Sequence, residues 1–132
     1  MATKKKRRRK KRVRNIGKYE SLKAGACTFR SSWEKAYFEY LDATSDVVSY
    51  MSESLKIPYI SNKKTGKIRN YIPDLLVTYL DGHRALIEIK PKKRVDNVKN
   101  VRKFLAARLW CLAHGCDFVI ITEVELKALG LL

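Results

Sequence analysis

The chain has 132 residues, of which 45% are hydrophobic, and its 29 Lys and Arg against 13 Asp and Glu give a formal net charge of +16. This length allows one hydrophobic core but excludes two, and the charge indicates a polyanionic partner, either nucleic acid or an anionic membrane surface. The sequence excludes a membrane-spanning helix, because no segment approaches the roughly 18 to 20 apolar residues that one needs.

The N-terminal segment is almost entirely basic: ten of the eleven residues from Lys4 to Arg14 are Lys or Arg. Repulsion between these charges predicts a disordered or extended arm. The arm can neutralise DNA phosphates through residues such as Arg7, Arg8 and Arg9, and a solubilising or nuclear-localising run is the alternative. We expect no secretory signal, since no apolar stretch follows. We expect residues 15–29 to form an arm or loop, and we place the arm at 1–28 and one folded domain at 29–132.

The first predicted helix begins with Ser31-Ser32-Trp33-Glu34. This sequence has the form of a capping box, with Ser31 as the N-cap and Glu34 at the third helical position. The apolar residues that follow at helical spacing are Trp33, Ala36, Tyr37, Tyr40 and Leu41. We expect the helix to end near residues 42–44.

Strand-forming residues dominate the middle of the chain. Residues 46–60 are rich in β-branched and aromatic side chains and predict one or two strands, followed by a turn at 62–66. A strand is expected over 67–80, with an edge, bend or bulge at Pro73. Asp81-Gly82 predicts a hairpin, and the strand over 83–90 is nearly continuously apolar, as in a buried central strand.

The last third of the chain predicts a long helix, a short strand over 117–122 and a final helical turn over 123–129. The long helix is capped by Asp96 or Asn97 and ends at Gly115. Its expected core stripe is Val98, Val101, Leu105, Leu109 and Leu112. The order of elements predicts an α/β fold with a mixed β-sheet flanked by helices. Cys27, Cys111 and Cys116 are odd in number and lack CxxC spacing, so we expect reduced thiols.

The pattern that points to chemistry is Asp74, then thirteen residues, then Glu88-Ile89-Lys90. Alternation along a strand puts Glu88 and Lys90 on one face. A two-residue turn at Asp81-Gly82 would point Asp74 to the wrong face. A three-residue loop that pairs Tyr79 with His83 sets Asp74 opposite Glu88, and a bulge near Pro73 would have the same effect.

Two carboxylates on one face repel each other, and a divalent cation relieves that repulsion. Lys90 beside them can contact a phosphate oxygen or position the attacking water, as hydrolysis of a phosphodiester requires. The alternative is that Asp74 simply starts a strand and that Glu88 and Lys90 form a solvated stripe. The apolar strand, the position of Asp74 and the basic chain favour the active site.

The Pro73-Asp74 and Glu88-Ile89-Lys90 motifs resemble the PD-(D/E)xK nuclease superfamily. Further segments resemble the catalytic domain of TnsA-type transposon endonucleases and, more closely, the small head-completion nucleases of tailed bacteriophages. These segments are Phe29–Glu34, Tyr40–Asp42, Val48, Ser52-Glu53, Ile57–Tyr59, Gly66-Lys67 and Tyr71–Asp74. The resemblance spans approximately Phe29 to Thr122.

The resemblance implies a restriction-endonuclease-like core and DNA cleavage that depends on Mg²⁺ or Mn²⁺. It implies metal ligation by Asp74, Glu88 and the backbone carbonyl of Ile89, with Glu34 joining the site, so that Glu34, Asp74, Glu88 and Lys90 form the catalytic set. Glu34 could instead be only the second half of the capping box. The chain departs from TnsA-type enzymes in carrying Glu88 where they tend to have Gln. Glu53 is a weaker candidate, and we expect His83 and His114 to be a turn residue and a helix-end residue.

Basic residues near the second helix are candidates for a DNA-backbone track: Lys92, Lys93, Arg94, Lys99, Arg102 and Lys103. No base-reading motif is visible, so we expect structure or context to select the cut. By resemblance, further partners are phage head or connector proteins, and the expected location is the cytoplasm of a bacterial host or the virion. Three alternatives remain: a Holliday-junction resolvase-like nuclease, a head-completion or connector protein that binds DNA without cutting it, and a ribosomal or histone-like binder.

Overall fold

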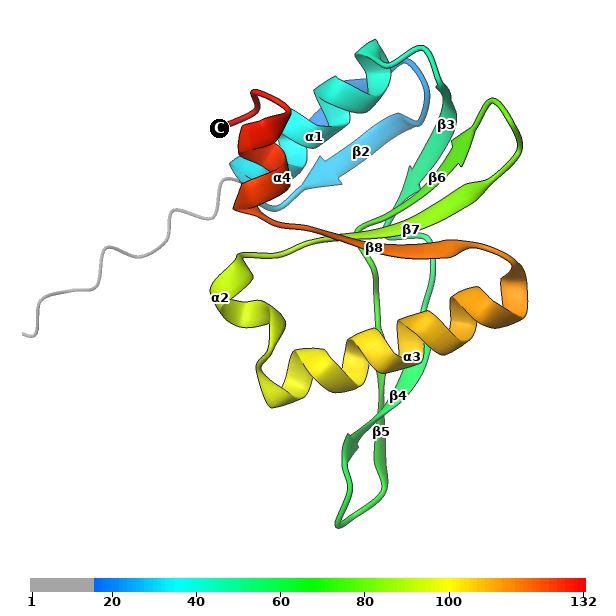
Figure 1. The fold of residues 1–132 in the computed structure, drawn as a ribbon, viewed down its shortest axis with the longest axis vertical. Helices are drawn as coiled ribbons and strands as arrows, with labels where there is room; N and C mark the ends of the chain where they lie inside the picture. Colours follow the sequence, from blue (N-terminus) through cyan, green and yellow to red (C-terminus); the bar gives the residue numbers. More distant parts are fainter. Residues whose placement is uncertain (1–15) are drawn as a thin grey trace, which may run out of the picture.

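The computed structural model describes residues 16–132 (Figure 1), so the predicted phosphate contacts of Arg7, Arg8 and Arg9 lie outside the described residues. The elements, in chain order, are β1 (Gly17–Ser21), β2 (Gly25–Phe29), α1 (Ser32–Ala43), β3 (Val47–Ser52), β4 (Ile57–Asn62), β5 (Lys67–Tyr71), β6 (Leu75–Tyr79), β7 (Arg84–Ile89), α2 (Lys92–Val95), α3 (Val98–His114), β8 (Asp117–Ile121) and α4 (Glu123–Ala128).

A four-stranded sheet in the order β3-β6-β7-β8 forms the centre of the fold. β3, β6 and β7 pair antiparallel, whereas β8 pairs parallel to β7 after the α2–α3 connection. Helix α1, the β1–β2 hairpin and α4 lie on one side of this sheet, and α3 lies on the other with the β4–β5 hairpin (Figure 1). The predicted mixed sheet flanked by helices is confirmed. Within residues 16–132, no helix is both long enough and apolar enough to span a membrane.

The alternation of side chains along β6 and β7 divides the apolar interior into two clusters, one on each face of the sheet. Leu75, Val77 and Ile87 pack with α1 and the β1–β2 hairpin. Leu76 and Leu86 pack against α3 and the base of the β4–β5 hairpin. The even-numbered positions of both strands therefore face α3, which matters because Asp74 and Glu88 are also even-numbered.

The core stripe predicted for α3 is wrong, because all five of its side chains are at least half exposed: Val98, Val101, Leu105, Leu109 and Leu112. The buried residues of the helix are instead Asn100, Phe104, Ala107 and Cys111. Both sets recur at steps of three and four, so periodicity alone cannot choose between them. The small side chains of Ala107 and Cys111 allow close approach to β4 and β8, and the Asn100 side chain donates a hydrogen bond to the carbonyl of Arg94 (2.7 Å).

Residues 17–29 are not the arm or loop that we expected, because they form the β1–β2 hairpin. Phe29 and Cys27 are buried in the cluster against α1, and Tyr19 packs on it while its hydroxyl donates to Asp42 (2.7 Å). The predicted arm of residues 1–28 therefore includes a hairpin that packs on the folded part. Short helix α2 was also not expected. The three cysteines are free thiols, in agreement with the prediction.

The β6–β7 hairpin has the three-residue loop that a working site requires. Tyr79 accepts a backbone hydrogen bond from Gly82 (2.9 Å) and donates one to His83 (3.0 Å), and Leu75 pairs with Ile87. Gly82 has a φ of 89°, in the left-handed region that favours glycine. The register that sets Asp74 opposite Glu88 is therefore confirmed.

Substituting Gly82 with alanine should destabilise the chain by about 1–2 kcal/mol, because an L-residue is strained at this φ although nothing crowds the added Cβ. Urea unfolding would measure the change. Leu80→Ala in the same loop is the matched control, since Leu80 is 67% exposed and its loss should cost less than about 0.5 kcal/mol. Equal stability of the two variants would contradict the role given to Gly82.

Candidate active site

Asp74 and Glu88 face each other across the β6–β7 pair, one step beyond the Leu75–Ile87 pair. Pro73 separates β5 from β6 at this point, so Asp74 lies where the chain leaves the long hairpin and enters the central sheet. The Asp74 backbone carbonyl still accepts a hydrogen bond from Glu53 N–H (3.0 Å), which continues the ladder with β3. The backbone thus fixes the relative position of the two carboxylates.

Glu88 is 4% exposed, and two neighbours stabilise its buried carboxylate. The Tyr71 hydroxyl donates to Glu88 Oε1 (2.7 Å), and Lys90 Nζ lies 3.3 Å from Glu88 Oε2. Burial and the negative charge of Glu88 raise the pKa of Tyr71, which keeps its hydroxyl protonated as a donor. Glu88 and Lys90 therefore form an ion pair, which agrees with the predicted placement of both side chains on one face.

The carboxylate of Asp74 is held against the backbone of the neighbouring strand. Its Oδ2 accepts a hydrogen bond from the Ile89 N–H at 2.7 Å. Burial raises the pKa of Asp74 well above its ordinary value, and the charges of Glu88 and Glu34 raise it further, while Ile89 N–H and Lys90 act in the opposite direction. The site therefore concentrates negative charge that the side chains around it balance only in part.

Glu34 lies in the first turn of α1 and is 8% exposed. The Ser31 Oγ accepts from Glu34 N–H and donates to Glu34 Oε2, both at 3.2 Å, so Ser31 is the N-cap as predicted, but the Glu34 carboxylate meets the Ser31 hydroxyl and not the Ser31 backbone N–H that a full capping box uses. Burial raises the pKa of Glu34, and the charges of Glu53 and Glu88 contribute to the increase. The structure thus brings Glu34 within electrostatic range of the Asp74–Glu88 pair, while Ser31 caps the helix. The ligation of a metal by Glu34 stays a prediction.

Two residues at this site were not assigned to it from the sequence. Tyr71 was treated only as a strand residue, and Lys103 only as part of the DNA track. Lys103 Nζ lies 5.7 Å from the centre of the Tyr71 ring and 6.0 Å from that of Tyr59. Burial, Lys99 and Lys90 lower the pKa of Lys103. Lys103 could have been assigned to the site from its position next to the buried residue Phe104 on α3. The prediction missed it because it chose the other face of the helix as the core face.

The other candidate residues lie farther from the carboxylates or have other partners. Lys92, Lys93 and Lys99 are exposed, Arg94 is half-buried, and Arg102 Nη1 donates to the Ser61 carbonyl (3.0 Å). Glu53 is paired with Arg30 (2.6 Å). His83 and His114 are hydrogen-bonded beside the β6–β7 turn and at the end of α3, as expected. The predicted DNA track therefore has both exposed and half-buried members.

The donor chemistry of the site fits a hard divalent cation. Within the described residues, no three His, Cys, Asp or Glu side chains already form a metal-binding group. However, Mg²⁺ typically takes one or two protein carboxylates and completes its shell with water and substrate phosphate. Asp74 and Glu88 supply a donor pair of this kind, because their carboxylates face each other. The pKa of Asp74 is raised in part by the negative charges of Glu88 and Glu34, and a bound cation would offset those charges.

Comparisons with known proteins place the chain in a family. Residues 44–123 match the family model described as the TnsA-like endonuclease N-terminal domain, a range that includes Asp74, Glu88 and Lys90. The chain is also 34% identical, over 139 aligned positions, to the head completion nuclease of Enterobacteria phage T4, with 89% of this chain and 91% of that protein covered. The chain therefore belongs to the family of TnsA-like endonucleases, within the PD-(D/E)xK superfamily to which its motif points.

Proposed function

We propose that this protein is a DNA endonuclease that depends on Mg²⁺ or Mn²⁺ and acts during completion of a phage head. The observation that carries the proposal is the pair of opposing carboxylates, Asp74 and Glu88, with Lys90 Nζ 3.3 Å from Glu88 Oε2. Endonucleolytic activity follows from the family, whereas the dependence on a metal and the residue roles are our proposals.

The carboxylates of Asp74 and Glu88 and the carbonyl of Ile89 would hold the cation, and Glu34 would complete its surroundings. A divalent cation bound there would lower the pKa of a water molecule and neutralise charge on the phosphate. Lys90 would orient the attacking water or donate to the phosphate oxygen on which negative charge develops. Tyr71 is a positioning residue, because its hydroxyl fixes one oxygen of Glu88 and leaves the other toward Lys90.

The DNA substrate would approach along the basic residues of α2 and α3. Lys103 lies beside the carboxylates, since its Nζ is 5.7 Å from the centre of the Tyr71 ring and the Tyr71 hydroxyl donates to Glu88. We propose that Lys103 contacts a phosphate next to the scissile one, while Lys92, Lys93 and Lys99 contact phosphates farther away. Contacts of this kind carry no sequence information. The site of cleavage would therefore be selected by DNA structure or by a partner.

The role in head completion rests on the relative from phage T4, whose name states that role. Identity of 34% over most of both chains supports the same task here. Under this proposal the other partners are phage head or connector proteins, and the protein works in the bacterial host or with the virion. A structural protein without cleavage is the alternative, and it is disfavoured by the retention of a complete Asp, Glu and Lys set.

The test is plasmid nicking at low salt. Supercoiled DNA incubated with the native chain should become nicked when Mg²⁺ or Mn²⁺ is present and should remain intact with EDTA, because the carboxylates alone supply no nucleophile. Conversion to the open-circular form on a gel measures the rate. A chain that binds the plasmid tightly but never nicks it with either metal would overturn the proposal and favour the structural alternative.

A further inference from the structure

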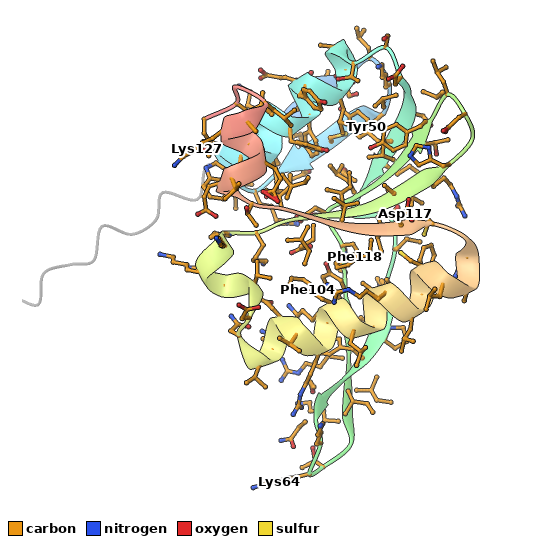
Figure 2. The ribbon with its side chains drawn as sticks, viewed as in Figure 1. Tyr50, Lys64, Phe104, Asp117, Phe118 and Lys127 are labelled. Atoms are coloured by element: carbon orange, nitrogen blue, oxygen red, sulfur yellow. The ribbon has the colours of Figure 1, made fainter. Side chains whose placement is uncertain are left out.

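The β4–β5 hairpin is a separate two-stranded sheet that extends beyond the central fold and past α3 (Figure 1). Every residue from Asn62 to Asn70 is exposed, and Lys64 lies at the tip (Figure 2). Between Ser54 and Pro73 the chain has five basic residues and no acidic residue. An exposed ribbon with this composition is not explained by packing, and the proposed catalytic set does not use its tip.

The basic side chains of β5 are aligned with the active site. Lys67, Arg69 and Tyr71 alternate along β5 and therefore share one face, because the irregularity of this pair lies on β4, between Ile60 and Asn62. Tyr71 at the base of this face donates to Glu88. Lys103 of α3 lies over the rings of Tyr59 and Tyr71, so the same face of the hairpin meets α3. A row of positive charge thus leads from the hairpin to the carboxylates.

We propose that the β4–β5 hairpin is a DNA-binding arm that lies in a groove of the duplex and guides one strand toward Asp74 and Glu88. This inference rests on the proposed function, because it names a second contact surface for the same substrate. The major groove of B-DNA is wide enough for a two-stranded β-ribbon. The positive charge of the hairpin is complementary to a polyanion. Duplex DNA is the polyanion on which the neighbouring active site would act.

The length of the hairpin fits this role. β5 runs from Lys67 to Tyr71, and its four steps of roughly 3.3 Å span about 13 Å. Phosphates of one DNA strand follow each other at about 3.4 Å along the axis, so the strand would run beside about four nucleotides. Its rigidity follows from its base, where Ile57, Tyr59 and Tyr71 are buried. The hairpin therefore sets the separation between its own contacts with the duplex and the site of cleavage.

The experiment compares two variants with the same change in net charge: Lys67→Gln/Arg69→Gln in the arm, and Lys18→Gln/Lys127→Gln on the exposed surface of β1 and α4. Anisotropy of a labelled 25-base-pair duplex in EDTA, at several salt concentrations, measures binding without cleavage. Each lost phosphate contact lowers the slope of log K against log [salt] by about 0.9. The arm variant should therefore lose about two from this slope and bind about 10- to 60-fold more weakly at 0.1 M salt. The surface variant should change by about twofold or less.

Nicking of plasmid with Mg²⁺ separates failure of this inference from failure of the proposed function. The arm variant should need more DNA for half-maximal nicking and reach nearly the native maximal rate. Both variants should melt like the native chain, because all four substituted residues are exposed. If the native chain binds and nicks while the two variants behave alike, the arm is refuted and the nuclease stands. If the native chain does neither, both proposals fail.

Discussion

Substituting Asp74 with asparagine should abolish nicking and at the same time stabilise the metal-free fold. We expect cleavage to fall by about 10³-fold or more, since the loss of one anionic donor removes several kcal/mol of stabilisation from the proposed metal site. The hydrogen bond from Ile89 N–H can be kept by the asparagine oxygen. The structural perturbation is therefore small, and activity and stability should change in opposite directions.

The stability gain has a defined pH dependence. The pKa of Asp74 is raised by folding, so the folded chain binds this proton more tightly than the unfolded chain does, and stability falls as pH rises from about 3.9 through the folded pKa. Above that pKa the full penalty of an ionised Asp74 is present. The asparagine variant avoids this penalty and should gain on the order of 1 kcal/mol, or several degrees in melting temperature, at pH 7.

Thermal melting at pH 7 and near pH 4, in EDTA, measures this effect. The advantage of the variant should shrink at the lower pH, where the native Asp74 is protonated. Asp46→Asn, at an exposed position, is the matched control and should stay within about 0.5 kcal/mol of the native chain. Mg²⁺ should raise the melting temperature of the native chain and not that of Asp74→Asn, because a ligand stabilises only a fold that binds it. A variant less stable than the native chain at pH 7 would contradict the assigned electrostatics.

Substituting Lys90 with alanine should remove cleavage and leave DNA binding nearly intact. A preorganised cation or donor at the reacting phosphate contributes about 10²- to 10³-fold to the rate. By contrast, Lys90 is one of many basic residues, so its share of binding is small. Removing its ammonium also leaves the buried Glu88 with Tyr71 as its remaining neighbour, which should cost about 1–3 kcal/mol in the absence of metal.

Single-turnover nicking and duplex binding by anisotropy, measured on the same preparation, test this role. Lys90→Arg retains the charge and serves as the matched variant; it should keep the stability of the fold while restoring cleavage only in part, since the guanidinium places its donors differently. Loss of binding and cleavage together in a folded Lys90→Ala chain would show that Lys90 acts mainly in holding DNA.

The register of the active-site hairpin could be predicted in part from the sequence. Counting along the strands shows that a regular two-residue turn would point Asp74 away from Glu88, and that a working site needs a three-residue loop or a bulge near Pro73. The structure decides between these two by forming the three-residue loop. The start of α1 was also predictable, since Ser31 and Glu34 interact within one helical turn. Local rules of this kind determine which residues are neighbours within an element or across a tight turn.

The face of α3 and the role of Tyr71 could not be predicted in this way. α3 has two stripes at helical spacing, and the choice between them depends on the shape of the sheet and hairpin that it meets. Tyr71 contacts Glu88 across seventeen residues of sequence, through a bend at Pro73 whose direction no local pattern gives. Residues 17–29 were misassigned for a similar reason, because their strands are stabilised mainly by packing on α1.

The exposed apolar stripe of α3 has a consequence for the behaviour of the protein in solution. At low ionic strength the net charge of +16 keeps copies of the chain apart. At about 0.1 M salt the Debye length is only about 10 Å, so this repulsion weakens and the stripe favours self-association. DNA affinity declines along the same titration. We therefore expect salt to reduce the protein bound to DNA both by weakening the binding itself and by favouring self-association, and light scattering on the same samples would distinguish the two effects.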